Sequence, residues 1–239
     1  DLTSVEGASN IPYEIPNVRV DLSTMVTGVP VLWWRSVGST HTAYVVEAFI
    51  DELASAAAKD PVDFRRALLA KHPRHRAALD LAAEKAAWSK PMAPGRFRGV
   101  ALAESFNTIV AEIAEISLGA RGQFTVERVV AAVDCGTAIN PDQVRAQIEG
   151  GIGFGLSAIL AEEITLNNGS VTQANYDHYL ILRIDRMPAV EVHIVASDAA
   201  PTGVGEPGVP PIGPALANAV FAATGKRVYT LPFAKGLST

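Results

Sequence analysis

The chain contains a single cysteine, Cys135, among its 239 residues. One thiol cannot form an internal disulfide, and it cannot build an iron–sulfur or zinc site from cysteines of this chain alone. No apolar run reaches the length of about eighteen residues that a membrane-spanning helix needs, so no span is predicted. The stretch after Asp1 has neither the basic start nor the apolar core of a signal peptide. Because the chain starts with Asp rather than Met, we expect it to be a piece of a longer protein.

Positive charge is also limited. The chain has 20 Lys and Arg residues against 25 Asp and Glu residues, a formal net charge of −5. No Lys/Arg cluster forms a basic patch, so we expect no nucleic-acid partner. Lys71, Arg74 and Arg76 lie close together, but with His72 and His75 they are interpreted as a solvated helix junction.

Two segments with different patterns follow from the sequence, residues 1–95 and residues 96–239, divided by a linker rich in Pro and Gly at 91–99. In the first segment, alternation at residues 18–22 indicates a strand. Apolar spacing and proline positions then predict a block of three helices, which begin near His41, at Pro61 and at Pro73. The acidic residues of the first helix are expected to be solvated or capping charges: Glu47, Asp51 and Glu52.

The second segment changes to a period of two. Alternation predicts strands at residues 100–106, 109–118, 124–134 and 188–195, with turns near Asn107 and at 119–122 and a hairpin at the Asn168-Gly169 pair. Three glutamates are expected on the exposed face of these strands: Glu112, Glu115 and Glu127. Asn140 is a good N-cap for a helix that extends to about Leu160.

Four glycines lie inside that predicted helix, at positions 150, 151, 153 and 155. Each costs about 1 kcal/mol relative to alanine in a helix interior. The cost is consistent with close approach by another backbone or by a flat ligand, and tight packing of two protein elements explains it equally well.

A loop with a single charge, Glu206, precedes a helix that carries no charge and ends at Gly225. The uncharged helix should be buried, which would hold the Glu206 carboxylate at or near the interior. Two interpretations stay open on the residues alone. The carboxylate is either a helix-dipole or surface-turn charge, or it is a general base. Arg35, next to two tryptophans, is likewise either a surface residue or a donor to a ligand oxygen.

Several motifs, in order from about Val31 to Phe233, together resemble the xanthine oxidase family of molybdenum hydroxylases, and specifically the C-terminal part of the isoquinoline 1-oxidoreductase type of large subunit. The motifs are Trp34-Arg-Ser-Val-Gly, Asp134-Cys-Gly, Asn140-Pro, Gln147-Ile-Glu-Gly-Gly, Asn175-Tyr-Asp-His-Tyr and Gly203-Val-Gly-Glu-Pro-Gly. The resemblance implies an α+β fold, the C-terminal portion of a molybdopterin-binding domain of the aldehyde oxidase/xanthine dehydrogenase type, with mixed sheets packed with helices.

The resemblance also implies roles for individual residues. Glu206 would be the catalytic general base, and no side chain would bind the metal. The cofactor would be held by Gln147, Arg35, Ser36 and Gly205, and the substrate pocket would include Trp34, Val37 and Tyr179. Val37 stands where many relatives have an aromatic residue, so we expect a pocket unlike that of purine hydroxylases.

The implied cofactor is molybdopterin with molybdenum, expected in the cytosine dinucleotide form, and the iron–sulfur clusters would lie on a partner subunit. The family's Gly-Gln-Gly segment and its segment for the far phosphate of the pterin do not occur in this chain. The expected partners are therefore the missing N-terminal half of the large subunit, an iron–sulfur subunit, and a small aldehyde or N-heteroaromatic substrate.

Two alternatives and the compartment stay open at this point. The chain could be a non-catalytic relative that kept the scaffold and lost the cofactor. A serine hydrolase built on Ser36 or Ser105 is disfavoured, because neither residue lies in a Gly-x-Ser-x-Gly elbow. The sequence does not separate bacterial cytoplasm from periplasm.

Overall fold

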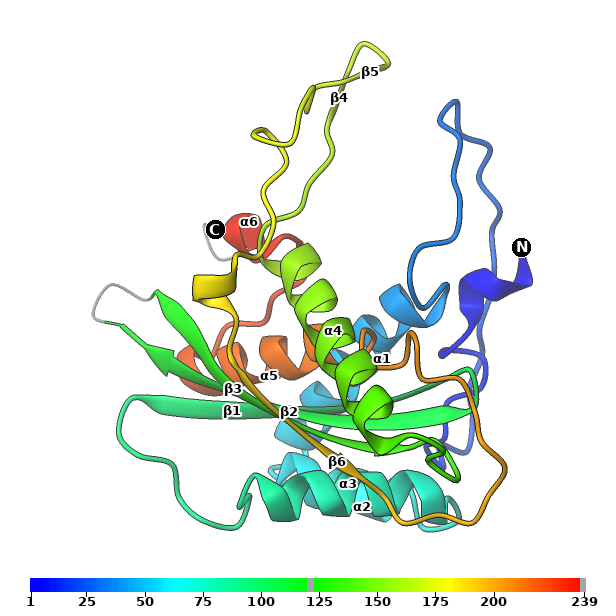
Figure 1. Cartoon of the computed structure of the whole chain (residues 1–239), viewed down its shortest axis with the longest axis vertical. Coiled ribbons are helices and arrows are strands. Elements are labelled where there is room, and N and C mark those ends of the chain that lie inside the picture. The colour runs from blue at the N-terminus through cyan, green and yellow to red at the C-terminus, as the bar shows by residue number, and fades with distance from the viewer. Residues whose placement is uncertain (120–122, 237–239) are drawn as a thin grey trace.

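The computed structural model describes residues 1–119 and 123–236. At its centre is a four-stranded sheet of order β1-β2-β3-β6 (Figure 1). The strands are β1 (Arg96–Ser105), β2 (Thr108–Leu118), β3 (Phe124–Asp134) and β6 (Ala189–Ile194). The first three form an antiparallel meander, whereas β6 pairs parallel with β3. A parallel neighbour requires a crossover connection, and this one contains helix α4 (Pro141–Leu160).

Helices cover both faces of the sheet, as Figure 1 shows. One apolar core joins the sheet to α4 and α5 (Ile212–Thr224), with Ile148, Ile152 and Leu216 among its members. The second core, which includes Leu79 and Ile113, lies on the other face. The helices that contribute to it are α1 (Ser39–Ala56), α2 (Pro61–Leu68) and α3 (Pro73–Lys85). This arrangement confirms the predicted α+β fold.

Most predicted elements are present at the expected places. The three helices of the first segment and the four strands of the second are confirmed, and the Asn140 side chain caps α4 by accepting a hydrogen bond from Gln143 N. The remaining elements are short: η1 (Leu2–Val5), β4 (Leu166–Asn167), β5 (Ser170–Val171), η2 (Ile184–Arg186) and α6 (Phe233–Gly236). The predicted turn at 119–122 falls largely on residues outside the described part. The division of the chain at residue 95 stays a prediction.

The strand expected at residues 18–22 is not formed. Its apolar side chains are exposed, and no described strand pairs with it. Figure 1 shows this region and residues 162–182 as two extended arms that project from the same side of the body. Alternation alone therefore did not produce a strand here, because a strand needs a neighbour with which to form its backbone hydrogen bonds.

The uncharged helix α5 is buried, as predicted, over residues 212–220. It lies directly on β1, where a side chain at Gly99 would overlap the backbone of Ala215 and Ala219. The Asn218 amide donates a hydrogen bond of 3.1 Å to Val100 O and so fixes the helix to the strand. The loop that carries Glu206 leads into this helix, so the C-terminal end of the loop is anchored to the sheet.

The expectation that Glu47 and Asp51 are solvated or capping charges is wrong. Glu47 is 1% exposed and forms a 2.9 Å ion pair with Arg65, which is fully buried. Tyr13 Oη donates to Glu47 Oε1 at 2.6 Å, and Leu102 N donates to Oε2 at 2.9 Å. Asp51 is also buried and pairs with Arg227 at 2.7 Å. Helix α1 turns these two acidic residues inward because Tyr13, α2, β1 and the segment after α5 supply partners for them.

The exposed face expected for the strand glutamates does not exist at Glu112 and Glu115, because helices cover both faces of β2. The two residues are three apart, so they point to opposite faces. Glu112 is fully buried, and no hydrogen-bond partner is present among the described residues. Glu115 is 9% exposed and pairs with Arg128 at 2.9 Å. Glu127 is half-buried and accepts a hydrogen bond from Ser117.

The supposed solvated junction around residue 74 is also corrected. Arg74 binds both carboxylate oxygens of Asp134, at 2.8 and 2.9 Å, and His75 is buried beside Glu104. Helix α3 is thereby tied to the end of β3. Among the described residues, no helix combines the length and the apolar content that crossing a bilayer requires.

Candidate active site

The loop that carries Glu206 packs against the backbone of α4. A Cβ added at Gly208 would lie 2.9 Å from Ile148 O, and one added at Gly151 would lie 3.1 Å from the Gly208 backbone. At Gly155 an added Cβ would lie 2.5 Å from Ile212 Cγ2. Contacts of about 3 Å and below leave no room for a side chain, so these glycines permit the loop and the helix to touch. Of the two explanations left open by the sequence, protein packing accounts for Gly151 and Gly155.

Glu206 is half-buried and is held by Ser36. The Ser36 amide donates a hydrogen bond of 2.8 Å to Glu206 Oε1, and the Ser36 hydroxyl donates one of 2.7 Å to Glu206 O. The second carboxylate oxygen, Oε2, makes no hydrogen bond to a described residue. One oxygen is thus used to orient the carboxylate, and the other remains available.

The segment that carries Ser36 has an unusual backbone. Ser36 and Val37 have φ angles of 79° and 50°, the left-handed region that residues with a Cβ seldom occupy. Such positions cost about 1–3 kcal/mol each and persist when the surroundings fix them. Here Val37 N donates to Trp34 O at 2.8 Å, and Thr40 Oγ1 donates to Arg35 O at 2.7 Å. The strain is what turns the Ser36 amide toward Glu206.

Arg35 connects the Glu206 loop to α4. Its Nε donates a hydrogen bond of 2.9 Å to Gly205 O, and Nη2 also contacts that oxygen. The same Nη2 lies 3.4 Å from both Gln147 O and Gln147 Oε1. Arg35 therefore uses its donors mainly on protein oxygens. The amide nitrogen of Gln147 has no partner among the described residues and can donate to a ligand.

Phe154 belongs to this site and was not predicted. Its ring lies 4.6 Å from the Trp34 ring, centroid to centroid, and 5.5 Å from the Arg35 guanidinium carbon. The signal was present in the sequence, because residues seven apart lie on one face of a helix and Phe154 follows Gln147 by seven.

Trp34 and Tyr179 line one cavity of about 670 Å³, together with Phe154 and Met187. Val37 lies on a second cavity, of about 490 Å³, which is formed with the first residues of the chain and which Trp34 also lines. Tyr179 Oη donates to Glu162 Oε2 at 2.7 Å. Burial, together with this hydrogen bond, raises the pKa of Tyr179 to about 12. The phenol therefore stays protonated near neutral pH, with its proton directed at Glu162.

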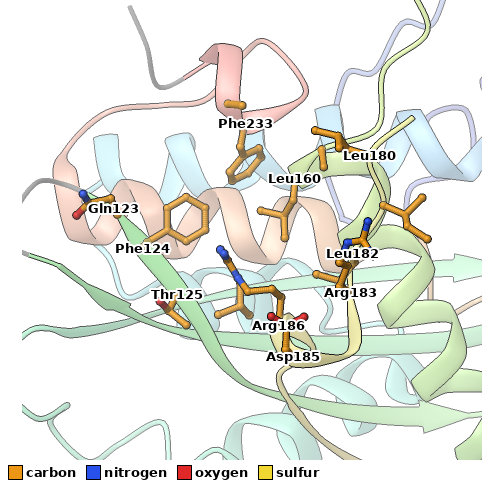
Figure 2. A pocket seen from close by; sticks show the side chains of 14 residues that line it. Gln123, Phe124, Thr125, Leu160, Leu180, Leu182, Arg183, Asp185, Arg186 and Phe233 are labelled. Carbon is orange, nitrogen blue, oxygen red and sulfur yellow. The ribbon is translucent and has the colours of Figure 1, made fainter. Parts of the chain in front are cut away.

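A separate cavity of about 630 Å³ lies beyond residues 181–183, which line both cavities (Figure 2). Its walls are mostly apolar, with Phe124, Leu160 and Phe233 around it, and its charged lining residues are two arginines and Asp185. None of the predicted site residues lines it. It is therefore distinct from the site that contains Glu206.

Asp134, the first residue of the Asp-Cys-Gly motif, has a structural position. Burial alone would raise its pKa, but hydrogen bonds from Arg74 and from Gly136 N hold the pKa below its usual range. The turn that follows is fixed to residues 199–202, through Thr137 N to Ala199 O at 2.9 Å and Thr202 N to Cys135 O at 3.0 Å. The motif thus fixes the start of the Glu206 loop.

The donor set suits a polar organic group better than a directly bound metal ion. No group of three or more His, Cys, Asp or Glu side chains in the described ranges could hold a metal. What converges instead is the Gln147 amide, the Arg35 guanidinium and the exposed Gly205, where the nearest atom to an added Cβ is 4.0 Å away. A pterin, which carries its own metal ligands, fits these residues.

Comparison with known proteins agrees with this chemistry. The sequence model of the molybdopterin cofactor-binding domain family matches residues 34–188, which include Arg35, Ser36 and Gln147. The chain belongs to this family, which confirms the family predicted from the sequence. Glu206 lies beyond the matched residues.

Two curated relatives are each 34% identical to this chain. One is the beta subunit of the isoquinoline 1-oxidoreductase of Brevundimonas diminuta, which matches 95% of this chain and of which the chain covers 30%. The other is a subunit of the nicotinate dehydrogenase of Pseudomonas putida, with 92% and 20% coverage. The chain thus spans less than a third of the length of these relatives. The solved aldehyde oxidoreductase of Desulfovibrio gigas covers all of this chain with a TM-score of 0.68 at 15% identity, and the chain covers 45% of it, which shows the fold alone.

Proposed function

We propose that this chain is the catalytic part of a molybdenum hydroxylase that oxidises an aldehyde or an N-heteroaromatic compound with oxygen derived from water, with Glu206 as the general base. The observation that carries the proposal is the Glu206 carboxylate, oriented by the Ser36 amide at 2.8 Å and placed beside Arg35 and Gln147 in a chain of the molybdopterin-binding family. The relatives named for isoquinoline and nicotinate oxidation support an N-heteroaromatic substrate.

The residues of this chain would act as follows. Molybdopterin, proposed to be the cytosine dinucleotide form, would supply a metal centre that accepts two electrons from the substrate. The Gln147 amide nitrogen would donate a hydrogen bond to this group, with Arg35, Ser36 and Gly205 around it. Glu206 Oε2, which has no protein partner, would take the proton from the water-derived oxygen as that oxygen attacks the substrate. The Ser36 N–H on Oε1 keeps the carboxylate in position during this transfer.

The activity would require further polypeptide. Cys135 is the single cysteine of the chain and is buried, so an iron–sulfur cluster would lie on other polypeptide, which we propose is a partner subunit. The rest of the large subunit would supply the cofactor-binding segments that this sequence lacks. Both relatives carry names that describe them as subunits, which supports an assembly.

The test is Glu206→Gln in the complete assembly, because glutamine keeps the shape of the side chain and removes its basic oxygen. Molybdenum and pterin content should stay unchanged while turnover falls about 10²- to 10⁴-fold. Glu84→Gln, at an exposed glutamate on α3, is the control and should retain full activity. Survival of activity in Glu206→Gln would refute the assignment of the base. An assembly that contains no molybdenum and is not activated by cofactor loading would instead favour a non-catalytic relative.

A further inference from the structure

Of the four glycines in α4, Gly150 alone has no neighbour that accounts for it. Gly151 and Gly155 touch the Glu206 loop and α5, and a Cβ at Gly153 would lie 3.2 Å from Met187 Cε. A Cβ at Gly150 would meet nothing within 4 Å, and the residue is exposed. Its backbone is helical, so no left-handed φ requires glycine there.

Gly150 differs in this respect from the other glycines with open surroundings. Gly95, Gly169 and Gly225 have φ angles between 70° and 83°, which favour glycine, and Gly28 lies in an irregular segment. Within a helix interior, glycine is the least favourable residue apart from proline. Protein packing in the described part of the chain therefore does not explain Gly150.

The position of Gly150 on the helix suggests an explanation for the glycine. It lies three residues after Gln147 and four before Phe154, spacings that place all three on one face of α4. Arg35 contacts both flanking residues, at 3.4 Å from Gln147 and 5.5 Å from the Phe154 ring. The backbone at Gly150 is thus an uncovered surface between the Gln147 amide, which has a free donor, and the Phe154 ring.

We propose that Gly150 is a cofactor-contact residue, where the planar pterin held by Gln147 lies directly against the backbone of α4. The inference rests on the proposed function for the identity of the pterin, whereas the uncovered backbone at Gly150 is a property of this chain. A methyl group at this position would hold a flat ring away from the backbone of the helix. It would thereby lengthen the hydrogen bond that the ring makes with Gln147.

The experiment uses the complete assembly and the variant Gly150→Ala. In assembly purified from a host that cannot make molybdopterin, the alanine should leave the thermal midpoint unchanged or slightly raised, since it improves helix propensity without a clash. In assembly from a normal host, the pterin released per large subunit, measured by its fluorescence after oxidation, should fall several-fold. Gly150→Leu should lower it further.

Gly153→Ala is the matched control, because it makes the same change in the same helix. Gly153 lies six residues after Gln147, off the row formed by Gln147, Gly150 and Phe154, and its added methyl would enter the cavity of Trp34 and Tyr179, where it meets only the flexible end of Met187. Pterin content in this variant should equal that of the wild type. In Gly150→Ala, a stability that does not fall together with a lower pterin content is not expected if residue 150 has only a structural role.

Two results would overturn the inference. Wild-type pterin content in Gly150→Ala and Gly150→Leu would show that the pterin does not lie against the backbone at Gly150. Loss of association with the rest of the large subunit, at unchanged pterin content in the protein that does assemble, would show that polypeptide covers it. If the wild-type assembly itself contains no pterin, the proposed function fails first, and that failure is recognised separately.

Discussion

Ser36 binds Glu206 twice, through an amide hydrogen bond of 2.8 Å to Oε1 and a hydroxyl hydrogen bond of 2.7 Å to the backbone oxygen, across 170 positions of sequence. The pair locks the loop before α1 to the loop before α5. The Ser36 amide that orients the carboxylate belongs to a residue with a left-handed backbone, which is a strained conformation for serine. The site is therefore a property of two loops together.

Ser36→Ala tests how much the hydroxyl contributes. The change removes one hydrogen bond and keeps the amide bond to Oε1, so we expect the free energy of unfolding to fall by about 0.5–1.5 kcal/mol. The Glu206 carbonyl keeps a second partner in Val209 N at 3.0 Å, which limits the loss. Thermal unfolding of matched preparations measures it. Turnover should fall much less than in Glu206→Gln.

Ser36→Gly is the companion variant, because it removes the same hydroxyl and also relieves the left-handed backbone. It should therefore be more stable than Ser36→Ala by about 1 kcal/mol. Equal stability of the two variants would mean that the backbone at residue 36 carries no strain.

The sequence predicted the elements well, because they depend on short-range pattern. The roles of the motif residues stay predictions. Period and proline placement located α1 to α5, and the motifs identified Arg35, Gln147 and Glu206, which the structure brings together. What pattern could not show is which face of a strand is covered. Alternation along β2 is compatible with one exposed face, but helices occupy both, and this is why Glu112 was wrongly expected in solvent.

The sequence also did not show which side chains from different elements contact each other. Arg65 and Glu47 are 18 positions apart, and only the packing of α2 on α1 shows that they pair. Phe154 was overlooked for another reason, since an aromatic residue on a helix is usually part of a core. Its contact with Trp34 follows from the loop before α1 and not from α4 itself.

The buried pair of Glu47 and Arg65 gives the second prediction. Burial, reinforced by the Glu47 carboxylate, raises the pKa of Tyr13 well above its usual range, so the phenol stays a donor to Glu47. Arg65→Met should cost about 3–5 kcal/mol of unfolding free energy, because it leaves Glu47 charged and buried without its partner. Chemical denaturation provides the measurement.

The double variant Glu47→Leu/Arg65→Met serves as the control, since it removes both charges. We expect it to be more stable than Arg65→Met alone and less stable than the wild type, because Tyr13 Oη and Leu102 N would lose their acceptor. If the losses of unfolding free energy in Glu47→Leu and in Arg65→Met add up to the loss in the double variant, the two residues do not interact.

Glu112 gives a prediction that depends on pH. Burial raises the pKa of this carboxyl well above its ordinary value, and its cross-strand neighbours, Ala101 and Ala131, offer no hydrogen bond from their side chains. In the unfolded chain the group loses its proton near pH 4.3, whereas in the folded chain it keeps it. The unfolded state thus binds fewer protons above that pH, so stability must fall as pH rises, by up to about 1.4 kcal/mol for each pH unit, until the folded group also ionises.

Glu112→Met isolates this contribution, because methionine has a similar length and no charge to bury. The variant should be more stable than the wild type at pH 8, and the difference should shrink toward pH 4, where the wild-type carboxyl is neutral in both states. Part of the difference should remain at pH 4, since a neutral carboxyl without a partner still costs free energy to bury. Urea denaturation at several pH values measures the effect. A difference that does not change with pH would mean that Glu112 is ionised, or reached by water, in the folded protein.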